Sequence, residues 1–282
     1  MRYSLLSRFR GAVLGAAVAR IWENSKLLPQ WETLAVFAAE NLIQKGQLDL
    51  EEWKNAYKQA VNSTSIKEKE REWAGAAYAI LPVILFFHED DKKMLSMLEQ
   101  TLGVWEYASC VRDWIICLAV ALAQALQEKL NPASFIPEIS TYFQENSQVS
   151  MQLLQVQTWL EEGLCLEAIK EWAQHSEDSA QYTSIALALY CFLSTPEDMR
   201  VSVMRAARIG KEPSITVALT GAISGAYNSI YGIPVAWRSQ LRHLNTNKAV
   251  AEIIQLGERL FAAWCGAYDI SAITTLSVTC PR

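Results

Sequence analysis

Cysteine and histidine are the side chains of this 282-residue chain that could act as nucleophiles, bases or zinc ligands. The cysteines stand at positions 110, 117, 165, 191, 265 and 280, and the histidines at 88, 175 and 243. Zinc sites use closely spaced pairs such as CxxC, and the sequence contains no such pair. We therefore predict no zinc site, and we expect ordinary buried thiols of a protein that works in a reducing compartment.

The acidic run Glu89-Asp90-Asp91 could hold a divalent cation, because hard cations prefer carboxylate oxygens. All-helical terpenoid synthases bind metals with a DDxxD pattern, whereas Lys92 and Lys93 follow the aspartates here. A carboxylate just before a helix also caps the free N–H groups of its first turn. A solvated loop or helix cap is the favoured interpretation, and an unrelated metal-dependent helical enzyme is the alternative.

The elements that must position any site are helices, because alternation with the strand period of two is scarce. Pro29 is typical of a first helical turn, and Gly46 of a C-cap. Asp49 and Glu52 form the pattern of a capping box at the start of the next helix. Later helices are predicted to begin at 195–198, at 233–234 and near 248. No Pro/Ser/Gly-rich tract divides the chain, so we predict an all-α fold with one compact multi-helix domain over residues 1–282.

The composition is that of a packed globular protein, with 51% hydrophobic residues, 12 glycines and 8 prolines. The formal charge of −5 is small, and lysine and arginine do not gather into a basic stripe. A protein that binds nucleic acid needs such a stripe to displace phosphate counterions. We therefore expect no nucleic-acid partner.

Two apolar stretches resemble membrane elements, because 11–19 imitates the core of a signal peptide and 213–237 is uncharged and long enough to span a bilayer. The first is nearly all glycine and alanine, and the second carries serines, threonines, an asparagine and two prolines. Buried central helices fit both stretches better. We therefore expect no membrane association.

Glycines recur at four-residue spacing within both stretches, as Gly11 and Gly15 and as Gly221 and Gly225. Each glycine inside a helix costs roughly 1 kcal/mol relative to alanine. A close approach of two helix backbones would offset that cost. We expect these two helices at the centre of the fold, and we consider packing against each other the natural arrangement.

Four segments resemble, in order, motifs of the ADP-ribosylglycohydrolase family, which includes the dinitrogenase reductase-activating glycohydrolases. Residues 10–20 resemble its opening GALLGLAVGDALG, and 74–82 resemble NGAAMRVAPIG. Residues 30–33 stand where the family has TDDT, and 210–226 align without a gap on GGDTDTIAAIAGALAGA. The resemblance extends over about residues 7–265, nearly the whole chain.

This resemblance implies an all-helical enzyme with two divalent cations, magnesium or manganese, that position ADP-ribose and activate water. Most positions that supply metal ligands in the family differ here. The substituted positions, together with the one threonine that remains, are Ala19, Arg20, Gln30, Trp31, Glu32, Thr33, Glu212, Ser214 and Ile215. Two glutamates, one serine and waters could hold at most one weak cation, whereas each ion needs about six oxygen ligands. We therefore expect no bound magnesium or manganese and assign no catalytic or metal residue.

The same positions form a vestigial ligand-binding site, which we call the candidate cleft. Its members are Arg20, Gln30, Trp31, Glu32, Thr33, Glu212 and Ser214. The favoured function is that of a catalytically inactive, cytoplasmic scaffold that binds or regulates a protein partner. Arg20 could instead contact a phosphate of ADP-ribose or another nucleotide, or pair with Glu23 or Glu32. A divergent hydrolase with a reduced metal site is the remaining alternative.

Overall fold

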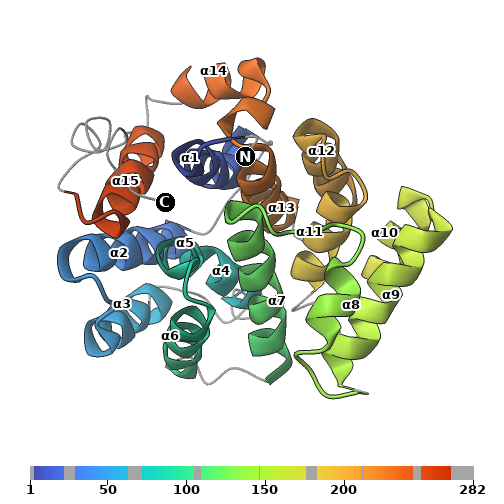
Figure 1. Cartoon of the computed structure of the whole chain (residues 1–282), viewed down its shortest axis with the longest axis horizontal. Helices are drawn as coiled ribbons and strands as arrows, with labels where there is room; N and C mark the ends of the chain where they lie inside the picture. The colour runs from blue at the N-terminus through green and yellow to red at the C-terminus, as the bar shows by residue number, and fades with distance from the viewer. Residues whose placement is uncertain are drawn as a thin grey trace.

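Helices are the regular elements of the computed structural model, which describes residues 3–21, 29–62, 72–104, 109–145, 147–175, 183–210, 213–243 and 249–267. For some residues next to these gaps, the backbone is described and the side chain is not. Within these ranges the chain forms no strand, which confirms the all-α prediction (Figure 1).

The helices follow one another with short connections, and their bounds agree with the predicted starts. In chain order they are α1 Leu5–Ala17, η1 Val18–Ile21, α2 Pro29–Lys45, α3 Leu50–Asn62, α4 Glu72–Ala79, α5 Leu81–Phe87, α6 Asp91–Gly103, α7 Ser109–Leu126, α8 Phe135–Ser140, α9 Gln148–Glu162, α10 Leu166–His175, α11 Thr183–Leu193, α12 Met199–Ile209, α13 Pro213–Asn228, η4 Ile230–Gly232, α14 Val235–His243 and α15 Ala249–Trp264.

The centre of the fold is the pair α1 and α13, which pack backbone against backbone (Figure 1). Gly15 faces Gly221, and a Cβ atom added to Gly15 would lie 1.9 Å from the Gly221 carbonyl oxygen. Gly11 faces Gly225 in the same way, with 2.1 Å to its carbonyl oxygen. The order of these contacts makes the two helices antiparallel. The predicted central pair is confirmed, and its glycines are required by the close approach.

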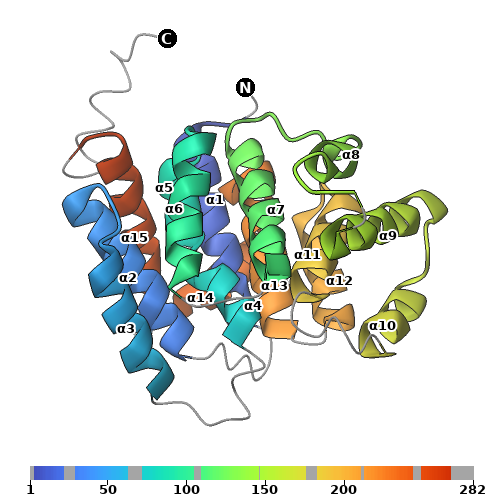
Figure 2. The same cartoon turned by 90° about the horizontal axis from the view of Figure 1, so that it is seen from below.

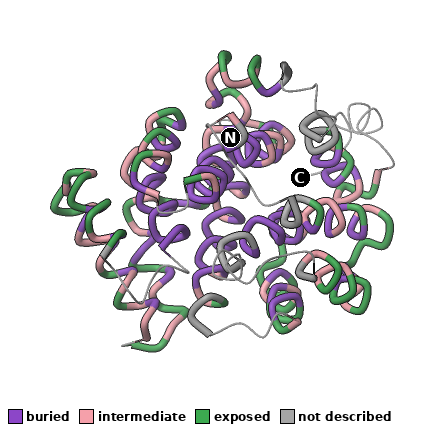
Figure 3. The backbone as a smooth tube through the Cα atoms, turned by 180° about the vertical axis from the view of Figure 1, so that it is seen from behind, coloured by how far each residue is buried: buried purple, intermediate pink, exposed green. Residues whose placement is uncertain are grey.

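The stretch 11–19 lies in α1 and η1 and is mostly buried, as predicted. The stretch 213–237 is a buried helix only in its first part, because α13 ends at Asn228 and Tyr231 and Val235 beyond it are 69% and 71% exposed. From Ile215 to Ala226 every residue of α13 is buried, and α13 also packs against α4, α7, α11 and α12. One hydrophobic core extends from α1 to α15, with buried residues in the interior and exposed ones on the outer helices (Figure 3). Within the described ranges, no helix has both the length and the apolar character needed to cross a bilayer.

The junction between α2 and α3 differs from the predicted capping box in one half. Asp49 Oδ1 accepts a hydrogen bond from Glu52 N (3.1 Å), as predicted. The Asp49 N–H, however, donates to Asn41 Oδ1 (2.9 Å), and the Glu52 carboxylate accepts from Asn41 Nδ2 (2.8 Å) and Lys45 Nζ (2.7 Å). Asn41 therefore replaces the side chain of Glu52 as the acceptor, and the network joins α3 to α2. Gly46 ends α2 with φ +66°, as expected for a C-cap.

The acidic run before α6 is a helix cap, because Asp90 Oδ1 accepts from Lys93 N (2.9 Å).

The cysteine prediction is correct in part. Cys117 and Cys191 are buried, and burial raises the pKa of both thiols. Cys165 and Cys265 are exposed, contrary to prediction, because they lie in the turns that follow α9 and α15. The side chains of the other two cysteines lie outside the described residues.

Candidate functional site

The elements of the candidate cleft meet at one end of the bundle. Because α1 and α13 are antiparallel, the first turn of α13 lies where α1 ends and η1 begins, and η1 contacts α13. Figure 2 shows that α2 starts at this same end, with α4 beside it. α4 contacts both α2 and α13. The backbones of Arg20 in η1, of residues 30–33 in α2 and of Ser214 in α13 are thus gathered at one end of the molecule.

Two cleft side chains are described directly. Thr33 is exposed in the first turn of α2, and Ser214 is half-buried in the first turn of α13. The side chains of Arg20, of residues 30–32 and the whole of Glu212 lie outside the described residues, so their role as a ligand-binding set stays a prediction. Helix N-termini carry partial positive charge. Cations could bind between α2 and α13 only where carboxylates outweigh that charge.

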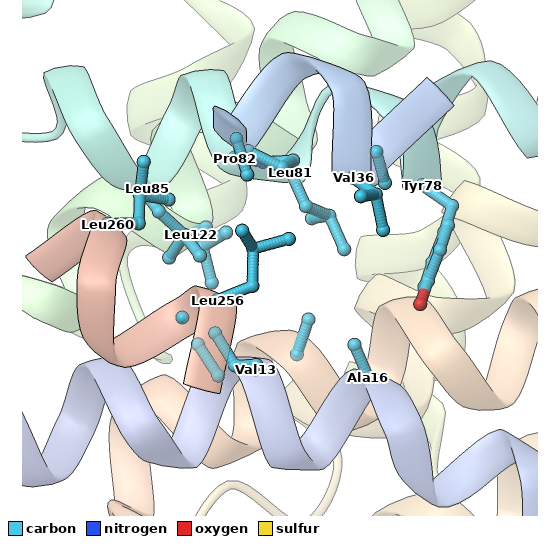
Figure 4. Close-up of a pocket in the computed structure, with 15 residues that line it drawn as sticks. Val13, Ala16, Val36, Tyr78, Leu81, Pro82, Leu85, Leu122, Leu256 and Leu260 are labelled. Carbon is cyan, nitrogen blue, oxygen red and sulfur yellow. The ribbon is translucent and has the colours of Figure 1, made fainter. Parts of the chain in front are cut away.

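A small apolar cavity of about 60 Å³ lies beside the second and third turns of α2. Figure 4 shows Val36, Ala16 and Leu256 around it, with Tyr78 at one end, and the cavity also reaches α5 and α13. The described side chains of the lining are aliphatic apart from that of Tyr78, whose hydroxyl is the one oxygen among them. A water molecule occupies roughly 30 Å³ in the liquid, and ligand pockets measure roughly 300–1,000 Å³. The cavity is therefore far smaller than a pocket that holds a nucleotide.

Comparison with known proteins agrees with this architecture. A family description, ADP-ribosylglycohydrolase, matches residues 29–269, which is most of the chain. The chain belongs to the ADP-ribosylglycohydrolase family. The match includes the segments at 30–33 and 210–226, whereas α1 precedes it.

Solved structures share the fold of this ADP-ribosylglycohydrolase family member. Twenty-eight chains match, among them one described as "ADP-ribosylglycohydrolase-related protein complex". Its TM-score is 0.59 at 18% identity, and the alignment covers 91% of this chain and 99% of that one. None of the curated proteins compared with the chain matches it.

Two described positions of the chain differ from the two-cation centre that the ADP-ribosylglycohydrolase resemblance implies. Ile215 stands where the family pattern has a threonine ligand, and its side chain is 6% exposed and part of the core. Ala19 replaces the glycine of the opening motif and is fully buried. Among the described residues, no group of three or more His, Cys, Asp or Glu side chains is placed to hold a metal. At position 215 the chain thus has an aliphatic side chain where a hard cation would need an oxygen ligand.

Sequence reasoning missed a second polar cluster of this ADP-ribosylglycohydrolase relative, on the other side of α1. Arg10 of α1 forms an ion pair with Glu258 of α15 (2.8 Å), and Arg238 of α14 lines the same space. A charged residue inside the apolar first helix was the available signal. Its partners lie near the other end of the chain, so spacing along the sequence could not reveal them.

Proposed function

We propose that this member of the ADP-ribosylglycohydrolase family does not hydrolyse ADP-ribosyl bonds and acts as a binding or regulatory scaffold for a protein. The observation that carries the proposal is the burial of Ile215 in the core at a metal-ligand position of the family pattern. Hydrolysis in the family uses cations to activate water and neutralise developing charge. An aliphatic side chain can do neither.

The contrast between scaffold and ligand positions supports the same proposal. The family patterns have glycines at the positions of Gly11, Gly15, Gly221 and Gly225, and the backbone contacts of α1 with α13 require all four. The glycines that the packing requires are thus kept, whereas most positions that supply oxygen ligands in the family have other residues here. This is the pattern expected when the fold is needed and the chemistry is not.

The exposed face of α9 supports binding of a protein. Met151 and Leu154 lie nearly one turn apart on this helix and are 57% and 63% exposed. From Gln148 to Leu160 the helix has no charged residue. Protein interfaces are enriched in methionine, and their centres are depleted of charge. We define the exposed side chains of Met151 and Leu154 as the α9 face.

A hydrolysis assay tests the first half of the proposal. The purified protein would be incubated with an ADP-ribosylated protein and excess manganese or magnesium, with an active member of the family as the positive control. We expect no release of ADP-ribose above the uncatalysed rate. Turnover that depends on the cation would refute the loss of hydrolysis.

A matched pair of variants tests the second half. Met151→Glu with Leu154→Glu places two charges on the α9 face, whereas Met204→Glu alters another exposed methionine, 48% exposed on α12. We expect a partner isolated with the wild-type protein from native lysate to be retained by Met204→Glu and lost by the double variant. Equal retention by all three proteins would exclude the α9 face as the binding surface.

A further inference from the structure

A second cavity, of about 330 Å³, lies between α1, η4, α14 and α15. Figure 1 shows α14 above α1, with α15 to one side. Among the described residues of its lining, the charged ones are Arg10, Arg238 and Glu258, and the others are aliphatic or glycine. Arg10 precedes Arg20 by roughly 15 Å of helix axis, so this cavity is distinct from the candidate cleft.

The two arginines have hydrogen-bonding capacity to spare. Arg10 Nη2 contacts Glu258 Oε1 at 2.8 Å, which occupies one edge of that guanidinium. The Nε atoms of Arg10 and Arg238 are both buried, and within the described part of the chain neither has a hydrogen-bond acceptor. A buried N–H group without an acceptor costs the full desolvation of that group. The two arginines and one glutamate give the described part of the lining a net charge of +1.

We propose that this cavity binds a phosphate group, either inorganic phosphate or the phosphate of a small phosphate monoester. The guanidinium fork matches phosphate geometry, and the several oxygens of one phosphate can accept hydrogen bonds from both Arg10 and Arg238. The volume exceeds that of a bare phosphate and leaves space for waters or a sugar. The aliphatic walls formed by Leu14, Ile230 and Leu241 reduce the polarity around the arginines, which strengthens the charge interaction.

The backbone before Ile230 indicates that the wall of the cavity is held rigidly. Ser229 is fully buried with φ 62° and ψ −177°, a region that is essentially restricted to glycine. It packs against Gly11, where an added Cβ atom would lie 2.6 Å from the Ser229 carbonyl carbon. Such strain persists where the surrounding structure over-determines it, often at ligand sites. The cavity wall is thus fixed before any ligand arrives.

Calorimetric titration with inorganic phosphate at constant ionic strength tests the proposal. The variant Arg238→Gln removes one guanidinium from the lining, and Arg200→Gln, an exposed position on α12 outside the cavity, is the matched control. We expect Arg200→Gln to bind like wild type and Arg238→Gln to bind about 10- to 100-fold more weakly, as for loss of a charged hydrogen bond. No heat from the wild type at millimolar phosphate, or equal affinity of the two variants, would overturn the site.

Thermal unfolding keeps the test informative if a variant is less stable. Phosphate should raise the melting temperature of the wild type by mass action and leave that of Arg238→Gln nearly unchanged. An equal rise in both proteins would contradict the proposal. A parallel titration with ribose 5-phosphate separates the sources, because tighter binding than inorganic phosphate identifies a monoester and equal binding identifies free phosphate. The site does not depend on the proposed loss of hydrolysis.

Discussion

Replacing Gly15 by alanine probes the central helix pair most sharply. The new Cβ atom would lie 1.9 Å from the Gly221 carbonyl oxygen and 2.6 Å from its carbonyl carbon, and contacts below 3.0 Å are essentially never observed for real Cβ atoms. The obstacle is backbone, which cannot rotate away, so α1 and α13 must separate locally by more than an ångström. Overpacking costs about 1–3 kcal/mol or somewhat more, and the better helix propensity of alanine returns about 1 kcal/mol.

Because the overlap is severe and with backbone, the upper end of that range applies, and we expect Gly15→Ala to lower the free energy of unfolding by about 2 kcal/mol, measured by urea titration. Gly103→Ala is the matched control, because Gly103 is the last residue of α6 and an added Cβ atom meets nothing within 4 Å. The control should be neutral or gain up to about 1 kcal/mol. Equal stability of Gly15→Ala and Gly103→Ala would contradict the close approach of α1 and α13.

Three further predictions concern stability. Asp198→Ala removes the N-cap acceptor of Val201 N (3.0 Å) and should lower the unfolding free energy by about 1 kcal/mol; an unchanged urea midpoint would contradict this. Ser229→Gly should raise the unfolding free energy by up to about 1 kcal/mol, because its backbone conformation suits glycine; a clear loss in the same titration would count against strain. Burial lowers the pKa of His88, so its contribution to stability should be complete above about pH 6.5 and should decline as the pH falls through the lower pKa of the folded state. His88→Gln should flatten this decline. An identical dependence of stability on pH in the two proteins would exclude this contribution of His88.

The fold could be predicted from the sequence because its signals are local. Pro29, Gly46 and Asp198 act within one helical turn, and each marks the helix end expected of it. The spacing of the glycines also predicted the central pair, since a helix tolerates such glycines only when something closely approaches them.

Features that depend on distant partners could not be predicted. The side chain of Asn41 displaced Glu52 from half of the capping box, although the local pattern was complete. The pairing of Arg10 with Glu258 joins opposite ends of the chain and left no trace in sequence spacing. For the candidate cleft, the family resemblance identified the positions, and the burial of Ile215 adds a fact that the alignment alone does not contain.

Manganese binding to the purified protein tests the central claim most directly. The protein would be dialysed against micromolar manganese, and the metal bound per chain would be measured by elemental analysis beside an active member of the family. The replacement of metal-ligand positions by Trp31, Ser214 and Ile215 predicts fewer than two ions per chain and no tight pair. Two manganese ions per chain, retained at micromolar concentration, would contradict it.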